Sequence, residues 1–129
     1  MIKKDQKTIL IVEDEVVQRK SLVTKFELEG FKVFQASNGE EGLKVALKNH
    51  PDIILLDLLM PKMDGREMLI ELYRDKWGMG VPVFILSNLS DSKTIIENIK
   101  NGVSDYLVKS EYKIQDVVDK VNARLAEKF

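Results

Sequence analysis

The sequence contains no cysteine, no long apolar run near its start and no excess of either charge. Without cysteine, a disulfide framework or a thiolate metal site is impossible, which agrees with a cytoplasmic location. The first apolar run, residues 8–12, is far shorter than a signal-peptide core or a membrane span. Twenty Lys and Arg against 21 Asp and Glu provide no basic field for nucleic acid or an anionic membrane surface. We therefore expect no membrane insertion, no direct binding of nucleic acid, and small proteins or metabolites as partners.

The length favours a single domain. A chain of 129 residues can bury about two-thirds of the surface that it exposes when unfolded. No linker, repeat or low-complexity stretch divides it. We expect residues 1–129 to form one domain without an output domain.

Short runs rich in β-branched residues predict the strands. Residues 8–12, 53–56, 81–86 and 106–108 lack polar alternation, which is typical of strands covered on both faces of a parallel sheet. A fifth run, FKVFQA from Phe31, does alternate. We expect this strand to lie nearer an edge.

Segments of helical periodicity separate the strands. The first is predicted to have Val16, Val23 and Phe26 on its inner face and to end at Gly30. The third is expected to reach about Trp77. Candidate N-caps of the first four helices are Asp14, Asn38, Asp64, and Ser90 or Asp91.

The clearest amphipathic helix is the last, with apolar residues at 114, 117, 118, 121 and 125. Five strands that alternate with five helices predict an α/β fold, a doubly wound parallel five-stranded sheet. In such sheets, ligands bind beyond the carboxyl ends of the strands. Functional residues are therefore expected just after each apolar run.

The residues after the strands are chemically complementary. Glu13 and Asp14 follow the first strand, Asp57 the third, Ser87 the fourth and Lys109 the fifth. Carboxylates brought together there would repel one another unless a hard cation such as Mg²⁺ or Mn²⁺ held them. A hydroxyl and an ammonium opposite them are suited to a transferring phosphoryl group, and Asp57 is then the natural nucleophile.

Four motifs in this order and spacing, IVEDE, DIILLDLLMPKMDG, ILSN and YLVK, resemble the receiver domain of bacterial two-component response regulators, in particular stand-alone receivers of the chemotaxis type. The likeness covers essentially the whole chain. It implies a flavodoxin-like (βα)5 fold and a histidine kinase or phosphotransfer protein that phosphorylates Asp57. It also implies that Asp14, Asp57 and the main-chain carbonyl of Leu59 bind Mg²⁺ directly, and Glu13 through a water.

The resemblance implies further roles near the phosphoryl group. Lys109 pairs with the phosphoryl group, Ser87 contacts it and moves on activation, and Tyr106 turns inward as the aromatic switch. The face formed by the fourth helix, fifth strand and fifth helix is the expected surface for a downstream protein target or a phosphorylation-dependent homodimer.

Two positions depart from the family pattern. Glu13 stands where an aspartate is usual, a replacement that should keep metal binding, and Ser110 stands where proline usually follows the lysine in a cis bond. A cis bond costs about 3–4 kcal/mol before serine, against about 0.5–1 kcal/mol before proline. We therefore predict a trans Lys109–Ser110 bond in a rearranged loop, and slower phosphorylation if Lys109 is displaced.

Other functions stay open. The main alternative is a pseudo-receiver, a protein-interaction module that phosphorylation does not regulate. An aspartyl-phosphate phosphatase would need a second acid at position 59, which is leucine. We thus expect a switch rather than an enzyme, with at most self-phosphorylation and self-dephosphorylation. The single histidine, His50, is expected to be a solvated loop residue without a chemical role.

Overall fold

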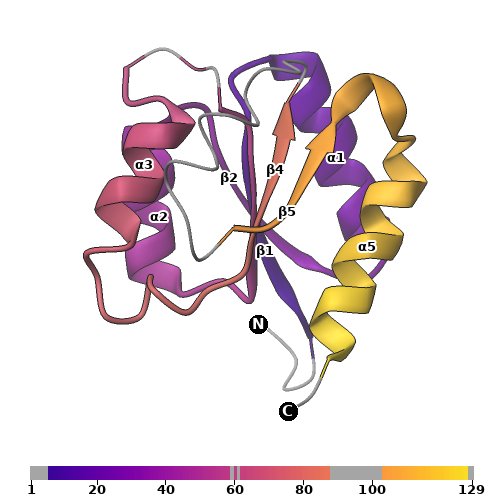
Figure 1. The fold of residues 1–129 in the computed structure, drawn as a ribbon. Coiled ribbons are helices and arrows are strands. Elements are labelled where there is room, and N and C mark those ends of the chain that lie inside the picture. Colours follow the sequence, from indigo (N-terminus) through magenta and orange to yellow (C-terminus); the bar gives the residue numbers. More distant parts are fainter. Residues whose placement is uncertain (1–5, 59, 61, 88–102, 128–129) are drawn as a thin grey trace.

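A computed structural model describes residues 6–127 of the chain except 59, 61 and 88–102. Strands and helices alternate along most of this length (Figure 1). Their bounds are β1 (Thr8–Val12), α1 (Val16–Leu28), β2 (Lys32–Ala36), α2 (Gly39–Asn49), β3 (Ile53–Leu56), α3 (Gly65–Leu72), β4 (Val83–Ser87), β5 (Val103–Val108), a 3-10 turn (Lys109–Glu111) and α5 (Ile114–Ala126).

The five strands form one parallel sheet in the order β2-β1-β3-β4-β5. The predicted α/β fold with a five-stranded parallel sheet is therefore confirmed. The chain winds from β1 outward to β2 and then returns past β1 to β3, so the winding direction reverses between β1 and β3. This reversal is where a ligand site is expected. β2 lies at an edge of the sheet, as predicted, and is less buried than the central strands, although exposure does not alternate strictly along it.

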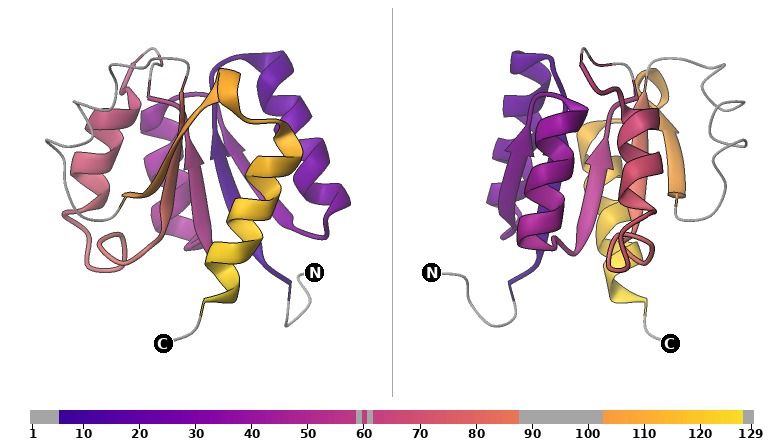
Figure 2. Two further views of the ribbon diagram at one scale, coloured as in Figure 1. Left: turned by 45° about the vertical axis from the view of Figure 1, so that its right-hand side comes forward. Right: turned by 90° about the vertical axis from the view of Figure 1, so that its left-hand side faces the viewer.

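Helices cover both faces of the sheet. Figures 1 and 2 show α1 and α5 on one face and α2 and α3 on the other. Successive residues of the central strands point into different cores: Ile9 and Ile53 pack with α1 and α5, whereas Leu10 and Ile54 pack with α2 and α3. Each such fully buried side chain contributes about 1.5–3 kcal/mol to stability, which explains why the central strands are apolar throughout.

Several predicted helix boundaries are confirmed. The Asn38 side chain accepts a hydrogen bond from the Glu41 amide at 2.9 Å, and Asp64 accepts one from the Glu67 amide at 2.9 Å, so both act as N-caps. Gly30 follows the end of α1 with a φ of 95°, a left-handed conformation that favours glycine. The predicted fourth helix, with its caps Ser90 or Asp91, lies outside the described residues.

The first helix differs from its prediction. Asp14 is not the N-cap: α1 begins at Val16 after Glu15, which makes no side-chain capping hydrogen bond. The Asp14 carboxylate instead joins the acidic group described below. Val16 was placed wrongly on the inner face, because it is 52% exposed; Leu22 packs inward with the predicted Val23 and Phe26.

The third helix is shorter than predicted. It ends at Leu72 rather than near Trp77, and turns continue to Gly80. The Asp75 carboxylate accepts a hydrogen bond from the Gly78 amide at 2.9 Å. A short polar side chain that bonds to nearby backbone in this way favours turns over a continuing helix.

The residues after β5 adopt the predicted trans arrangement. Among the described residues no peptide bond is cis, so the bond between Lys109 and Ser110 is trans, and Lys109–Glu111 form a 3-10 turn. No helix in the described part of the chain is long and apolar enough to cross a bilayer.

Candidate functional site

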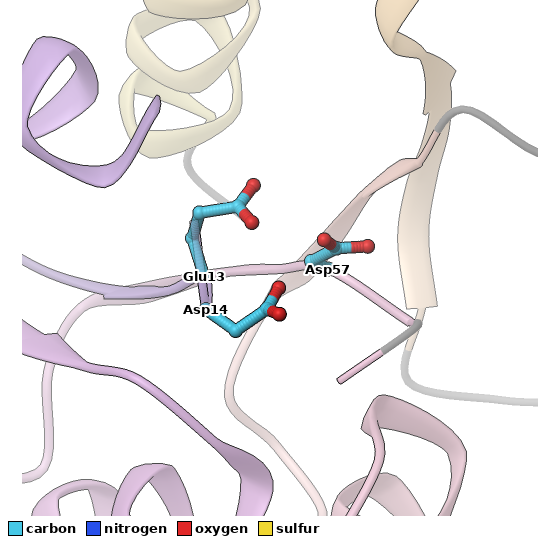
Figure 3. Close-up of side chains that lie close together, drawn as sticks. All are labelled: Glu13, Asp14 and Asp57. Carbon is cyan, nitrogen blue, oxygen red and sulfur yellow. The ribbon is translucent and has the colours of Figure 1, made fainter. Parts of the chain in front are cut away.

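The predicted acidic residues meet at the carboxyl ends of β1 and β3. The sheet ladder continues just beyond both strands, because the Glu13 amide donates to the Ala36 carbonyl at 3.0 Å and the Asp57 amide donates to the Val12 carbonyl at 3.0 Å. These bonds hold the backbone of both acids in place. Figure 3 shows their side chains close to that of Asp14.

The three carboxylates form a compact group. One oxygen from each of Glu13, Asp14 and Asp57 lies within 4.8 Å of the others. Glu13 is only 2% exposed and Asp57 only 8% exposed, so water screens this charge poorly. The structure thus brings together the acids that the sequence placed after separate strands.

Lys109 compensates part of this charge. Its Nζ lies 2.6 Å from Glu13 Oε1 and 3.4 Å from Asp57 Oδ2, and its side chain is 15% exposed. Burial alone would lower the pKa of the Lys109 ammonium. The hydrogen bond to Glu13 and the charges of Asp57 and Glu13 outweigh burial and raise this pKa above its ordinary value of 10.5. Lys109 is therefore a stable cation at neutral pH.

Gln18 contacts Lys109, although its place in the sequence did not predict a role at the site. Its side-chain oxygen accepts a hydrogen bond from Lys109 Nζ at 2.7 Å, across 91 residues of sequence. Gln18 lies one turn before Leu22 and two before Phe26, the buried positions of α1. Gln18 continues the buried face of α1 toward the carboxyl ends of the strands. A polar residue at such a position could have indicated a contact with the site.

The other predicted site residues are placed only in part. Tyr106 is half-buried and packs against the core between the sheet and α2 and α3. Ser87 is the last residue of β4, but its side chain lies outside the described part of the structure, as does Leu59. The functional roles of all three stay predictions.

The acidic group fits a hard divalent cation. Together with the Lys109 ammonium, its three carboxylates carry a net charge of −2 when all four groups are ionised. Carboxylate oxygens are the ligands that Mg²⁺ prefers, and Mg²⁺ binds through one or two carboxylates plus water and phosphate oxygens. Asp14 and Asp57 could hold such an ion, while Glu13 is engaged by Lys109 and by the Glu15 amide at 3.2 Å.

Comparison with known proteins gives a consistent result. Residues 9–122 match the family model of the response regulator receiver domain. Transcriptional regulatory protein SrrA of Staphylococcus aureus is 36% identical over 117 residues, which cover 91% of this chain and 47% of that protein. A protein of Porphyridium aerugineum named "Probable transcriptional regulator ycf27" is 38% identical over 101 residues, which cover 78% of this chain and 41% of that protein.

Among solved structures, the response regulator TrrA of Thermotoga maritima, crystallised in complex with Mg(2+)-BeF, superimposes with a TM-score of 0.81. It shares 29% identity, and the match covers 93% of this chain and 99% of that chain. This chain spans about two fifths of the length of the first curated relatives that it matches.

Proposed function

This chain belongs to the family of response regulator receiver domains, and from that membership we propose that it is a phosphoryl-accepting signalling switch with Asp57 as the acceptor. The observation that carries the proposal is the position of Asp57, which is buried beside two further carboxylates and faces the Lys109 ammonium. A helix N-terminus rich in acids would explain Glu13 and Asp14 alone, but it would not require a lysine from the far end of the chain.

The chemistry follows from these groups. A carboxylate oxygen of Asp57 attacks the phosphorus of a phosphohistidine on a kinase or phosphotransfer protein, the P–N bond breaks, and the leaving imidazole takes up a proton. The Lys109 ammonium donates to the transferring phosphoryl oxygens, whose negative charge it offsets. Bound Mg²⁺, or Mn²⁺, would neutralise further charge on the same oxygens, and the Mg(2+)-BeF complex of TrrA supports this assignment.

Phosphorylation tests the proposal directly. Incubation of the protein with acetyl phosphate and Mg²⁺ should add one phosphate per chain, and hydroxylamine, which cleaves acyl phosphates, should remove it. A pseudo-receiver that is not regulated by phosphate is the alternative. It predicts no uptake of phosphate. A titration with Mg²⁺ then shows whether the acidic group still binds the metal.

We expect Asp14→Asn to weaken Mg²⁺ binding by at least about tenfold, because outer-shell partners alone are worth about 10–100-fold and Asp14 is proposed to bind directly. The readout is thermal unfolding with and without metal: at 100 times its Kd, a ligand stabilises the native state by about 2.7 kcal/mol. Asp119→Asn, which removes an exposed carboxylate from α5, is the matched control. Equal Mg²⁺ stabilisation of Asp14→Asn and the control would contradict the assignment.

We further propose that output passes through the face that includes β5 and α5, together with the fourth helix outside the described residues. Lys109 directly follows β5, and Tyr106 lies within it. Because Lys109 contacts Asp57, a change of charge at Asp57 acts directly on the residue that follows this strand. Backbone amide shifts of β5 and α5 should therefore change on phosphorylation. Amides near Thr8 and Asp52, at the opposite end of the sheet, should change little. Unchanged shifts along β5 and α5 would exclude this face.

Other parts of the interpretation stay predictions. They are the cytoplasmic location, the single domain over residues 1–129, the downstream protein target, the phosphorylation-dependent homodimer, and the absence of enzymatic activity beyond self-phosphorylation and self-dephosphorylation. What the curated relatives do in the rest of their longer chains is a property of those proteins.

A further inference from the structure

Gln18 lies beside the site without belonging to its acidic group. It is partly buried in α1 and lines an open cavity of about 210 Å³ between α1 and α5, where Leu22, Leu86 and Val117 supply apolar wall. Lys109 lines the same cavity. A lysine commonly lays its apolar stem along such a wall while its ammonium reaches a polar edge, here the carboxyl ends of the strands.

The Lys109 ammonium has three N–H donors and finds three acceptors among the described residues. Two contacts are short: 2.6 Å to Glu13 and 2.7 Å to Gln18. The third, to Asp57, is long at 3.4 Å. The two short contacts hold the ammonium in place. The long contact is to Asp57, the residue expected to accept the phosphoryl group.

The chemistry of the Gln18 amide suits a holding role. An ammonium only donates, so the atom that faces it is the amide oxygen. That oxygen is neutral, so it anchors the cation without adding a fourth charge to the three carboxylates. Because a neutral acceptor binds an ammonium less strongly than a carboxylate does, Gln18 also leaves Lys109 free to bond to phosphoryl oxygens.

We propose that Gln18 is a positioning residue for phosphoryl transfer, which holds the Lys109 ammonium so that one N–H is directed at Asp57. This inference rests on the proposed function, because it concerns the lysine that would contact the phosphoryl group. In this role Gln18 acts through Lys109 and does not touch the phosphoryl group itself.

Gln18→Met tests the proposal, since methionine keeps the length and helix propensity of glutamine but removes the strong acceptor. At saturating acetyl phosphate and Mg²⁺, the maximal rate of phosphate uptake should fall about three- to tenfold, the worth of one hydrogen bond to a charged group that water replaces in part. The half-saturating concentrations of acetyl phosphate and Mg²⁺ should stay within about twofold, because Gln18 binds neither.

A second readout follows Lys109 itself. In ¹H–¹⁵N spectra of side-chain ammonium groups at low temperature, the signal of Lys109, identified by its absence in Lys109→Met, should broaden or vanish in Gln18→Met. Gln18→Glu restores an acceptor of the same reach and should restore the signal. Gln115→Met, at an exposed position of α5 where the glutamine donates to Asp119, is the matched control and should change neither the signal nor the rate.

The outcomes separate the two proposals. An unchanged maximal rate or an unchanged Lys109 signal in Gln18→Met overturns the positioning role. A wild-type protein that takes up no phosphate overturns the proposed function, and the ammonium spectra still decide whether Gln18 anchors Lys109. Circular dichroism and thermal unfolding confirm that each variant is folded.

Discussion

Asp57→Asn should abolish the uptake of phosphate from acetyl phosphate. An amide oxygen is a far weaker nucleophile than a carboxylate oxygen, and the substitution leaves the size of the side chain unchanged. No other described carboxylate lies against Lys109 except Glu13, which is held in a 2.6 Å ion pair with it. Intact-mass spectrometry after incubation with acetyl phosphate and Mg²⁺ measures the loss, and hydroxylamine sensitivity identifies the wild-type adduct as an acyl phosphate.

Asp52→Asn is the matched control, at the opposite end of the same strand. The Asp52 carboxylate accepts hydrogen bonds from the Thr8 amide at 2.8 Å and the Thr8 hydroxyl at 3.1 Å, and an asparagine keeps an acceptor there. We expect this variant to take up phosphate at the wild-type rate. Hydroxylamine-sensitive phosphate in Asp57→Asn at the wild-type level would show that another residue is the acceptor.

Lys109→Met should destabilise the metal-free protein by about 2–4 kcal/mol, because removal of one partner of a buried ion pair leaves the other charge poorly compensated. Glu13 is 2% exposed and loses its 2.6 Å partner, and Asp57 loses its nearest described cation. Saturating Mg²⁺ should recover much of this loss, since the ion supplies positive charge to the same carboxylates and no longer competes with the lysine. Chemical denaturation with and without Mg²⁺ measures both effects.

The contribution of Lys109 also predicts a dependence on pH. Since the folded protein raises the pKa of this ammonium, its stabilisation is complete below the ordinary value of 10.5 and is lost as the pH rises through the raised folded value. The difference in unfolding free energy between wild type and Lys109→Met should therefore be constant near neutral pH and shrink in strong alkali. A difference that disappears at neutral pH would contradict the ion-pair account.

Lys44→Met is the control for this variant. The Lys44 side chain is 78% exposed and pairs with Glu40 at 3.7 Å on the surface of α2. Surface ion pairs of this kind contribute about 0–1 kcal/mol, so the unfolding free energy should change little and Mg²⁺ should not affect the change.

The strands, two helix caps and the edge of the sheet at which the acids lie could be predicted from local sequence. The apolar runs at 53–56 and 9–12 are typical of strands covered on both faces, and the acids after them therefore lie at one edge of a parallel sheet. Asn38 and Asp64 could be identified as caps because capping needs only residues within one turn. The meeting of the acids with Lys109 followed from strand register in the same way.

Only the tertiary structure decided the contacts that depend on how helices lie against the sheet. Lys109 and Gln18 are 91 residues apart, and the periodicity of α1 shows which face is inward but not where its first turns end relative to the sheet edge. The same holds for His50, which is exposed yet stacks on Trp77 with ring centroids 4.2 Å apart. Periodicity is a property of one element, whereas these contacts depend on the rotation and tilt of one element against another, which packing of the whole core sets.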